Sequence, residues 1–245
     1  MLLTNIIPPR SQELKDALNV FNRFLEEPHS DPNERLEIFI GGGRGCGKST
    51  IAAGMMLKAH AETKGWGFCI KRSTSSSVKV VMPCFQWSLC KIGVPREEVS
   101  ISLQSKTLHL KGREAKITFT GIDMGAEQFW MKTRGIPNKR FAWIEDAHQF
   151  SRNEYEAILD SLDLRENPII ITTFNPSPNR SHWLNEYAAD IYKHNGQQGR
   201  WVFKPIYWDM DTDMIGNSFF EKAEECRKCC PELYVKEYLG IPMER

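Results

Sequence analysis

Short apolar runs alternate with stretches of helical periodicity along most of this chain. The runs have the length of buried strands, and several end at glycine or at polar residues. Ser151–Leu162, between two such runs, has the spacing of a helix capped by Ser151 and Glu154. Strands that alternate with helices predict an α/β fold in which helices cover both faces of a mainly parallel sheet. The predicted strands are Leu36–Ile40, Gly67–Ile70, Arg140–Ile144, Pro168–Thr173 and Trp201–Tyr207.

Other segments complete this outline. Glu13–Leu25 has the pattern of an amphipathic helix, and Ser75–Gly93 predicts a helix that is interrupted or begins near Pro83. Two alternating runs, Lys106–Leu110 and Lys116–Thr120, predict a β-hairpin. We therefore divide the chain into a lead-in helix region, residues 1–35, and one domain, residues 36–245. Further helices are expected at Phe219–Lys228 and Glu232–Leu239.

The composition is that of an ordinary globular protein. Hydrophobic residues make up 41% of the chain and charged residues 26%, which excludes disordered, collagen-like and coiled-coil classes. The sequence shows no signal peptide and no apolar run near the ~20 residues of a membrane span, so we expect an intracellular protein without a membrane partner. A net charge of +1 gives no electrostatic footprint for constitutive nucleic-acid binding, so any DNA contact should be local or transient.

The cysteines fit a reducing compartment, because a chain of this size folds without disulfides. Cys226 and Cys229 have CxxC spacing beside Cys230. No second pair and no paired histidine accompanies them in the sequence, which favours reduced thiols over a zinc site.

The strongest motif is GGRGCGKS at Gly42–Ser49, which fits the phosphate-loop pattern G-x-x-x-x-G-K-[ST]. It lies between a predicted strand and helix-forming residues, so its backbone N–H groups and the positive end of the helix would surround the phosphates of ATP. Lys48 is expected to bridge the β- and γ-phosphates and the Ser49 hydroxyl to bind Mg²⁺. The residues expected to contact the nucleotide are Gly42, Gly43, Arg44, Gly45, Cys46, Gly47, Lys48, Ser49 and Thr50.

Arg44 is unusual because it lies inside the loop. Its side chain could extend over the γ-phosphate as an arginine finger supplied by the same chain, or it could be a solvated loop arginine, and the sequence leaves both open. Cys46 is a small residue in a tight loop, and no neighbour marks it as a reactive thiolate.

FAWIEDA, Phe141–Ala147, is an apolar strand that ends in two adjacent carboxylates. Ligands bind at the carboxyl ends of parallel strands, so Glu145 and Asp146 should lie in the same crevice as the phosphate loop. We expect Glu145 to hold the Mg²⁺ shell and Asp146 to orient or deprotonate the attacking water. His148 is assigned to a helix cap or the surface rather than to a catalytic base.

IIITTFNPSP, Ile169–Pro178, is a second apolar strand with a polar end. Thr172, Thr173 and Asn175 could sense whether a γ-phosphate is present and so couple hydrolysis to movement. The Asn-Pro and Ser-Pro pairs also predict a turn, which is compatible with that role.

In this order, these motifs resemble those of the large subunit of tailed-phage DNA-packaging terminases. The resemblance covers about residues 36–242 and includes TTFNPSPNRSHW, CIKRSTSSSV, ITFTGID and ELYVKEYLGIP. It implies a RecA-like P-loop ATPase of the additional-strand (ASCE) kind, with ATP and Mg²⁺ as cofactors, that drives double-stranded DNA into a preformed capsid. The implied roles are ATP and Mg²⁺ binding for Lys48 and Ser49, a γ-phosphate contact for Arg44, metal binding for Glu145, water activation for Asp146, and coupling for Thr173 with Asn175.

Two departures from the family pattern affect these assignments. The second acid is usually glutamate, whereas Asp146 is one methylene shorter, so either acid could take either role. The large subunits usually continue into a nuclease domain, whereas this sequence ends at Arg245. We therefore expect a motor that is shortened or separately encoded, with the nuclease domain and DNA cleavage absent from this chain.

The resemblance also implies partners in the host cytoplasm, namely transiently bound double-stranded DNA, the portal protein, the terminase small subunit and further copies in a homo-oligomeric ring. A neighbouring copy could supply an arginine, for which Arg113, Arg134 and Arg140 are candidates, and Gln12 is a candidate adenine contact. Two alternatives stay open, a helicase-type ATPase and a nucleotide-gated docking module with negligible turnover.

Overall fold

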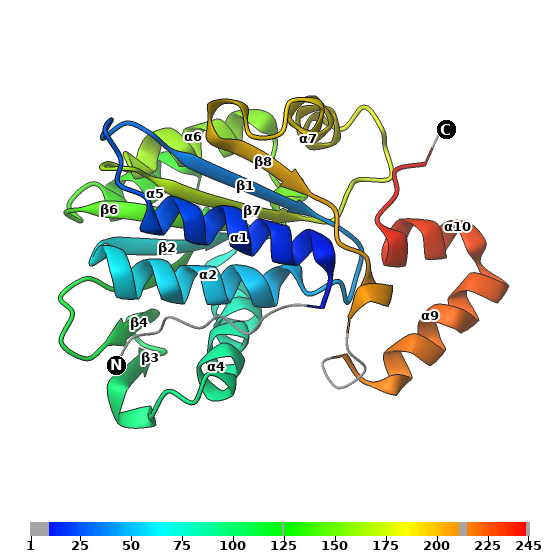
Figure 1. The fold of residues 1–245 in the computed structure, drawn as a ribbon, viewed down its shortest axis with the longest axis horizontal. Coiled ribbons are helices and arrows are strands. Elements are labelled where there is room, and N and C mark those ends of the chain that lie inside the picture. The colour runs from blue at the N-terminus through cyan, green and yellow to red at the C-terminus, as the bar shows by residue number, and fades with distance from the viewer. Residues whose placement is uncertain (1–9, 124, 211–214, 244–245) are drawn as a thin grey trace.

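The centre of the molecule is a mixed sheet in a computed structural model that describes residues 10–123, 125–210 and 215–243. In this part of the chain the sheet has eight strands in the order β3-β4-β5-β2-β6-β7-β1-β8 (Figure 1). The strands from β5 to β8 in that order run parallel, and β4 and β3 join antiparallel at the β5 edge. The strands are β1 Leu36–Gly41, β2 Trp66–Lys71, β3 Val99–Ser102, β4 Thr107–Leu110, β5 Ile117–Gly121, β6 Lys139–Ile144, β7 Ile169–Phe174 and β8 Arg200–Phe203.

Helices cover both faces of this sheet (Figure 1). On one face lie α1 (Gln12–Glu26), α2 (Lys48–Thr63) and α4 (Met82–Lys91), whose apolar residues share one core with the sheet. On the other face lie α5 (Ala126–Thr133), α6 (Arg152–Leu162) and α7 (Trp183–Lys193) over a second core. Every residue of β1 and β7 is buried, as expected for inner strands of a parallel sheet. The predicted α/β fold is thereby confirmed.

A third, smaller group of elements projects to one side of the sheet (Figure 1). It comprises α9 (Asn217–Cys229), α10 (Pro231–Tyr234) and η6 (Val235–Leu239), preceded by η5 (Tyr207–Asp209). Its core is aromatic, because Tyr207 lies among the rings of Phe219, Phe220, Tyr234 and Tyr238. This group has its own small core beside the main domain. The remaining short elements are α3 Thr74–Ser76, η1 Ser77–Val81, η2 Arg96–Glu98, η3 Ala147–Gln149 and η4 Gln197–Gly199.

Most predicted elements are present, with two differences in extent. The strand predicted over Trp201–Tyr207 ends at Phe203, because the Lys204 N–H donates to the Glu13 side chain and Pro205 has no N–H to continue the ladder. Of the two alternatives for the segment around Pro83, the structure has the interrupted helix rather than one that begins at Pro83: it starts at Thr74 and passes through a π-helical turn at η1 before Pro83 enters the first turn of α4.

Two helices, α5 and α7, and the short strand β3 were not predicted. Residues 1–9 of the predicted lead-in region lie outside the described residues, whereas α1 lies within one residue of its predicted bounds. Among the helices that the structure describes, none combines the length and the apolar character needed to cross a membrane.

Candidate nucleotide site

The phosphate loop connects β1 to α2 at the carboxyl edge of the sheet. Gly45 and Gly47 adopt left-handed backbone conformations, with φ of 73° and 79°, which only glycine adopts without strain. Lys48 begins α2 and is only 8% exposed, and its Nζ donates a 3.0 Å hydrogen bond to the Gly43 carbonyl. The ammonium group therefore lies within the turn of the loop, where the phosphates of a nucleotide would bind.

Glu145 follows β6 and lies opposite the first turn of α2. The Ser49 hydroxyl donates a 2.8 Å hydrogen bond to Glu145 Oε1, and the Thr173 hydroxyl donates to Oε2. The side chain is buried, and this burial is the main cause that raises the pKa of Glu145, with the adjacent Asp146 charge as the second. Thr173, Lys48 and Lys71 oppose that rise. The carboxylate thus connects the ends of two strands, β6 and β7, with helix α2.

Asp146 is turned toward a different partner. Its backbone is left-handed, with φ 55° and ψ 44°, and its Oδ2 forms an ion pair with the Nζ of Lys71 at the end of β2. The sequence therefore provides two neighbouring acids, but the structure separates their surroundings. Glu145 faces Ser49 on the phosphate-loop helix, whereas Asp146 faces the neighbouring strand on the other side.

Two adjacent threonines at the end of β7 also have different surroundings, because successive residues of a strand face opposite sides of the sheet. Thr173 contacts Glu145 and accepts a 2.7 Å hydrogen bond from Trp143 Nε1. Thr172 faces the other core, where its hydroxyl lies 2.8 Å from the Tyr155 hydroxyl. Of the two, Thr173 is the threonine in contact with the acid.

Asn175 and His148 connect the loops that follow β7 and β6. The Asn175 N–H donates a 3.3 Å hydrogen bond to His148 Nδ1, and burial lowers the pKa of His148, which favours the neutral acceptor form. The side-chain Oδ1 of Asn175 is buried, and none of the described residues donates a hydrogen bond to it. His148, assigned from the sequence to a cap or the surface, is half-buried here and bridges two loops of the site.

Arg44 extends away from the interior of the loop. Its side chain is 66% exposed, its Nε lies 3.2 Å from Glu237 Oε2, and its backbone N–H donates a 2.7 Å hydrogen bond to the Glu237 carbonyl. The C-terminal segment thus packs directly on the loop. A Cβ on Gly43 would overlap the carbonyl oxygen of Tyr238, and one on Gly45 would lie 2.5 Å from the Phe219 ring.

The three other candidate arginines have their partners away from this centre, whereas Gln12 lies in the turn of α1 whose Leu14 approaches Gly47. Arg140 pairs with Glu166, and Arg113 donates to the Ala61 carbonyl. Both contacts lie near the amino ends of the parallel strands, opposite the phosphate loop. Arg134 stacks over the Trp130 ring at 5.0 Å on the exposed side of α5. Gln12 donates a 2.7 Å hydrogen bond to Asp16 in the first turn of α1.

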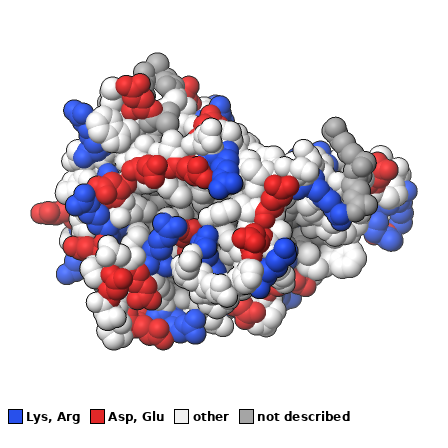
Figure 2. Space-filling model, turned by 90° about the horizontal axis from the view of Figure 1, so that it is seen from above, with Lys and Arg blue, Asp and Glu red and all other residues white. Residues whose placement is uncertain are grey.

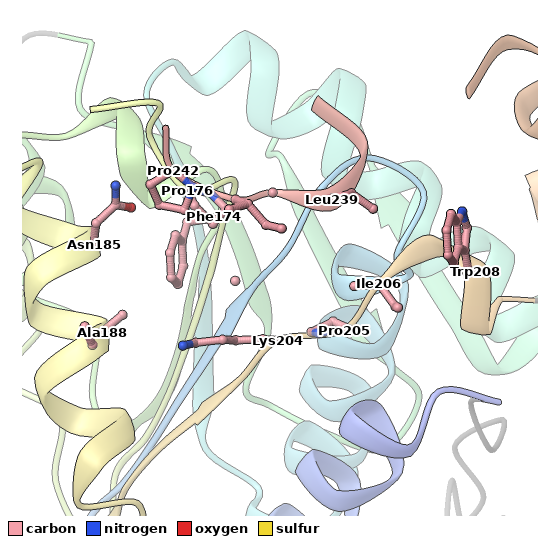
Figure 3. A pocket seen from close by; sticks show the side chains of 14 residues that line it. Phe174, Pro176, Asn185, Ala188, Lys204, Pro205, Ile206, Trp208, Leu239 and Pro242 are labelled. Atoms are coloured by element: carbon pink, nitrogen blue, oxygen red, sulfur yellow. The ribbon is translucent and has the colours of Figure 1, made fainter. Parts of the chain in front are cut away.

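An apolar cavity of about 560 Å³ is lined by Gly41, next to the phosphate loop, and by Asn185 and Ala188 of α7 (Figure 3). Phe174, Leu239 and Pro242 line it, and its amide side chain, Asn185, is already hydrogen-bonded to the Ser177 backbone at both ends. The cavity lies beneath the same C-terminal segment that contacts the phosphate loop.

The residues present fit a Mg²⁺ ion held jointly with a nucleotide. A serine hydroxyl and a carboxylate, with the oxygen atoms that Mg²⁺ prefers, meet within 2.8 Å at Ser49 and Glu145. Clusters of three or more His, Cys, Asp or Glu side chains suited to a metal do not occur in the described part of the chain. A magnesium site shared with phosphates needs only one or two protein ligands, because phosphate oxygens and water supply the others.

The strand order, with β7 between the phosphate-loop strand and the strand that carries the acids, places the chain in the RecA-like class of P-loop NTPases. Within that class, the chain belongs to the phage terminase large subunit family, whose model matches residues 33–240. A search of curated protein sequences found no match.

Solved structures support the same fold. The large terminase of a thermophilic bacteriophage matches with a TM-score of 0.69 at 14% identity, over 95% of this chain and 53% of that protein. The HK97 bacteriophage large terminase gives 0.69 and 14% over 94% of this chain and 50% of that protein. The ATPase domain of the Thermus phage P74-26 large terminase gives 0.55 and 17% over 89% and 95%. The chain therefore spans about half of the two large terminases and nearly all of the separate ATPase domain.

Two charged residues of the site, Lys71 and Glu237, were not predicted from the sequence. Lys71 follows an apolar run at the carboxyl end of a strand, which is the same signal that identified Glu145, and could have been found by it. Glu237 lies near the end of the chain, and no local pattern connects it to the phosphate loop.

Proposed function

We propose that this chain is a Mg²⁺-dependent ATPase and that it serves as the motor domain of a terminase large subunit, driving double-stranded viral DNA into a procapsid. The observation that carries this proposal is the contact between Ser49 and Glu145, because it pairs the hydroxyl of the phosphate-loop helix with a buried acid. Family membership supports the packaging role. The large terminase of the thermophilic bacteriophage, a relative in fold, has been solved with ATP-γ-S and with ADP.

Each residue has a defined part in this reaction. Lys48 exchanges the Gly43 carbonyl for the β- and γ-phosphates of ATP, and Ser49 and Glu145 provide oxygen ligands for Mg²⁺. Bound Mg²⁺ supplies positive charge to the phosphate oxygens. Asp146 accepts a proton from water as the water oxygen attacks the γ-phosphorus, and the bond from that phosphorus to the bridging oxygen breaks to give ADP and phosphate.

Coupling to movement is assigned to the end of β7. Thr173 contacts Glu145 directly, and Asn175 is tied to the loop after β6 through His148. A change at the acids when the γ-phosphate departs would therefore reach the loop that follows β7 through two hydrogen bonds. Thr172, on the opposite face, connects this strand to α6 through Tyr155.

DNA binding by the single chain is expected to be weak and transient. Figure 2 shows Lys and Arg side chains interspersed with Asp and Glu over the face seen from above, and the net charge is +1. Affinity for linear DNA should fall steeply with salt concentration, as for contacts made mainly to phosphates. We assign the portal protein, the small subunit and further copies in a ring as partners in the host cytoplasm.

Steady-state ATP hydrolysis tests the proposal. We expect turnover in the intact chain that increases with linear double-stranded DNA, and its loss in Lys48→Ala, Glu145→Gln and Asp146→Asn. Saturable ATP binding without turnover under all conditions would refute the ATPase and favour a nucleotide-gated docking module. Strand separation driven by ATP would indicate a helicase-type enzyme instead.

A further inference from the structure

Lys71 is a buried cation whose partner is one of the two acids of the site. It ends β2, where Ile70 is paired with Ile144 of β6 and the Glu145 N–H donates to the Ile70 carbonyl at 2.9 Å. This pairing brings Lys71 level with the acids. Its side chain is 7% exposed, and its Nζ contacts Asp146 Oδ2, while the Asp146 side chain is 20% exposed.

The burial of Lys71 makes this contact difficult to break. A buried ammonium group that loses its carboxylate keeps the desolvation cost of its charge without the compensating attraction. Asp146 could leave Lys71 only by removing the one carboxylate that contacts it among the described residues, because the cation is fixed at the end of an inner strand between β5 and β6. The pair should therefore persist when a nucleotide enters the site.

The ion pair also fixes the orientation of Asp146. It engages Oδ2, so the second carboxylate oxygen, Oδ1, is the one that can accept a proton from water. Asp146 has a left-handed backbone and contacts Lys71 of β2, and its short side chain has only two rotatable bonds to be held. A base whose position is set by a third group is the arrangement that activates nucleophiles in many enzymes.

We propose that Lys71 is a positioning residue for ATP hydrolysis, which holds Asp146 through Oδ2 so that Oδ1 faces the attacking water. This inference rests on the proposed ATPase function. Lys71 itself touches neither ATP nor water in this arrangement. Its loss should therefore reduce kcat and leave nucleotide affinity nearly unchanged.

The test compares Lys71→Met, Lys71→Arg, Asp146→Asn and the double variant Lys71→Met/Asp146→Asn in the intact chain. We expect Lys71→Met to reduce kcat on the order of 10²-fold, as for a reacting group displaced by about 1 Å, with KM changed less than about threefold. Lys71→Arg should restore at least a tenth of the activity. The double variant should be no slower than Asp146→Asn alone, because both substitutions remove the same function.

Lys58→Met is the matched control, because Lys58 is equally buried in α2 but pairs with Asn22, Glu26 and Glu62 away from the site. It should lower stability and leave kcat within about twofold of the wild type. Calorimetric binding of ATP-γ-S and ADP distinguishes the positioning role of Lys71 from a second role, direct contact with the γ-phosphate. If Lys71→Met weakened ATP-γ-S binding but not ADP binding, Lys71 would be a γ-phosphate contact and the positioning role would be wrong.

The remaining outcomes distinguish the positioning role from the other possibilities. Faster turnover in Lys71→Met would show that Lys71 restrains Asp146 rather than positions it. Additive losses in the double variant, or no rescue by arginine together with a lowered melting temperature, would show a structural role. Absence of turnover in the wild type overturns the proposed function itself, whereas wild-type turnover that is lost in Asp146→Asn and kept in Lys71→Met overturns only the role of Lys71.

Discussion

Ser49 Oγ and Glu145 Oε1 lie 2.8 Å apart although 96 positions separate them in the chain. The contact joins the first turn of α2, the helix that follows the phosphate loop, to the end of β6. In the sheet, β6 lies two positions from β1, the strand that precedes the loop. The contact gives Glu145 the surroundings of a metal ligand and leaves Asp146, which faces Lys71, as the acid available to a water molecule. We therefore propose Glu145 as the metal ligand and Asp146 as the base, the order of roles expected from the sequence.

Glu145→Gln should separate stability from activity. Burial raises the pKa of Glu145, so the ionised side chain destabilises the nucleotide-free fold, whereas glutamine keeps the shape and hydrogen-bonding oxygen without the charge. Relative to the wild type at neutral pH, we expect the free energy of unfolding to increase by roughly 1 kcal/mol and the melting temperature to rise by about 2–4 °C, while turnover is lost. Thermal melting without nucleotide, beside an ATPase assay, measures both. A melting temperature lowered by several degrees would contradict this account of the buried charge.

Asp146→Asn should have the opposite effect on stability. It leaves the Lys71 ammonium buried without a counter-charge, and because Asp146 is partly exposed we expect a cost of about 2–3 kcal/mol. Denaturant unfolding measured at one pH for the wild type and both acid variants gives the comparison. Equal stability of Asp146→Asn and the wild type would mean that the ion pair contributes nothing to the fold.

His60 should make the fold sensitive to acid. It is buried in α2, where desolvation lowers its pKa to about 4 from an ordinary value near 6.5. Between these values the unfolded chain binds a proton and the folded chain does not, so the free energy of unfolding falls as pH decreases from about 6.5 to 4. The loss from this residue should reach about 3 kcal/mol.

Urea unfolding at a series of pH values, with His60→Gln as the comparison, measures this contribution. The difference between the two proteins should change through that window and be constant above pH 7. Parallel pH profiles would show that another group causes the acid sensitivity.

The close approach of the C-terminal segment to the phosphate loop leads to a steric prediction. A Cβ at Gly43 would overlap the Tyr238 carbonyl, which belongs to backbone and cannot turn aside as a side chain could. Gly43→Ala should cost about 1–3 kcal/mol and increase proteolytic cleavage near η6. Gly135→Ala is the control, because a Cβ added at Gly135 would have no atom within 4 Å, and its effect should stay within about 0.5 kcal/mol. Similar melting temperatures for both variants would show that the segment moves aside at no cost.

The parts of the site that depend on a few consecutive residues could be predicted from the sequence. The phosphate loop, the acids and the polar end of β7 each follow an apolar run, and the parallel sheet brings these strand ends together. Lys71 also ends an apolar run and could have been found in the same way, whereas the contact of Glu237 depends on pairing between distant segments and leaves no local pattern. The strand β3 was missed because it is short and none of its residues is fully buried, and α7 because it follows a turn rich in proline and asparagine. Thr172 and Thr173 are adjacent in sequence, but strand alternation places them on opposite faces.

Arg44 and Glu237 provide a final prediction, on nucleotide discrimination. Without nucleotide, Arg44 is held by the Glu237 carboxylate, so a γ-phosphate must compete with that ion pair for the arginine. Because Arg44 is largely exposed, the pair should contribute only about 0.2–1 kcal/mol. Glu237→Gln should therefore tighten binding of ATP-γ-S roughly two- to fivefold and leave ADP binding unchanged. Isothermal titration with both nucleotides measures the difference, and Glu224→Gln, which removes an exposed ion pair with Arg227 in α9, is the matched control. If Glu237→Gln kept its effect in an Arg44→Ala background, or shifted ADP and ATP-γ-S equally, Arg44 would not be the group that the γ-phosphate recruits.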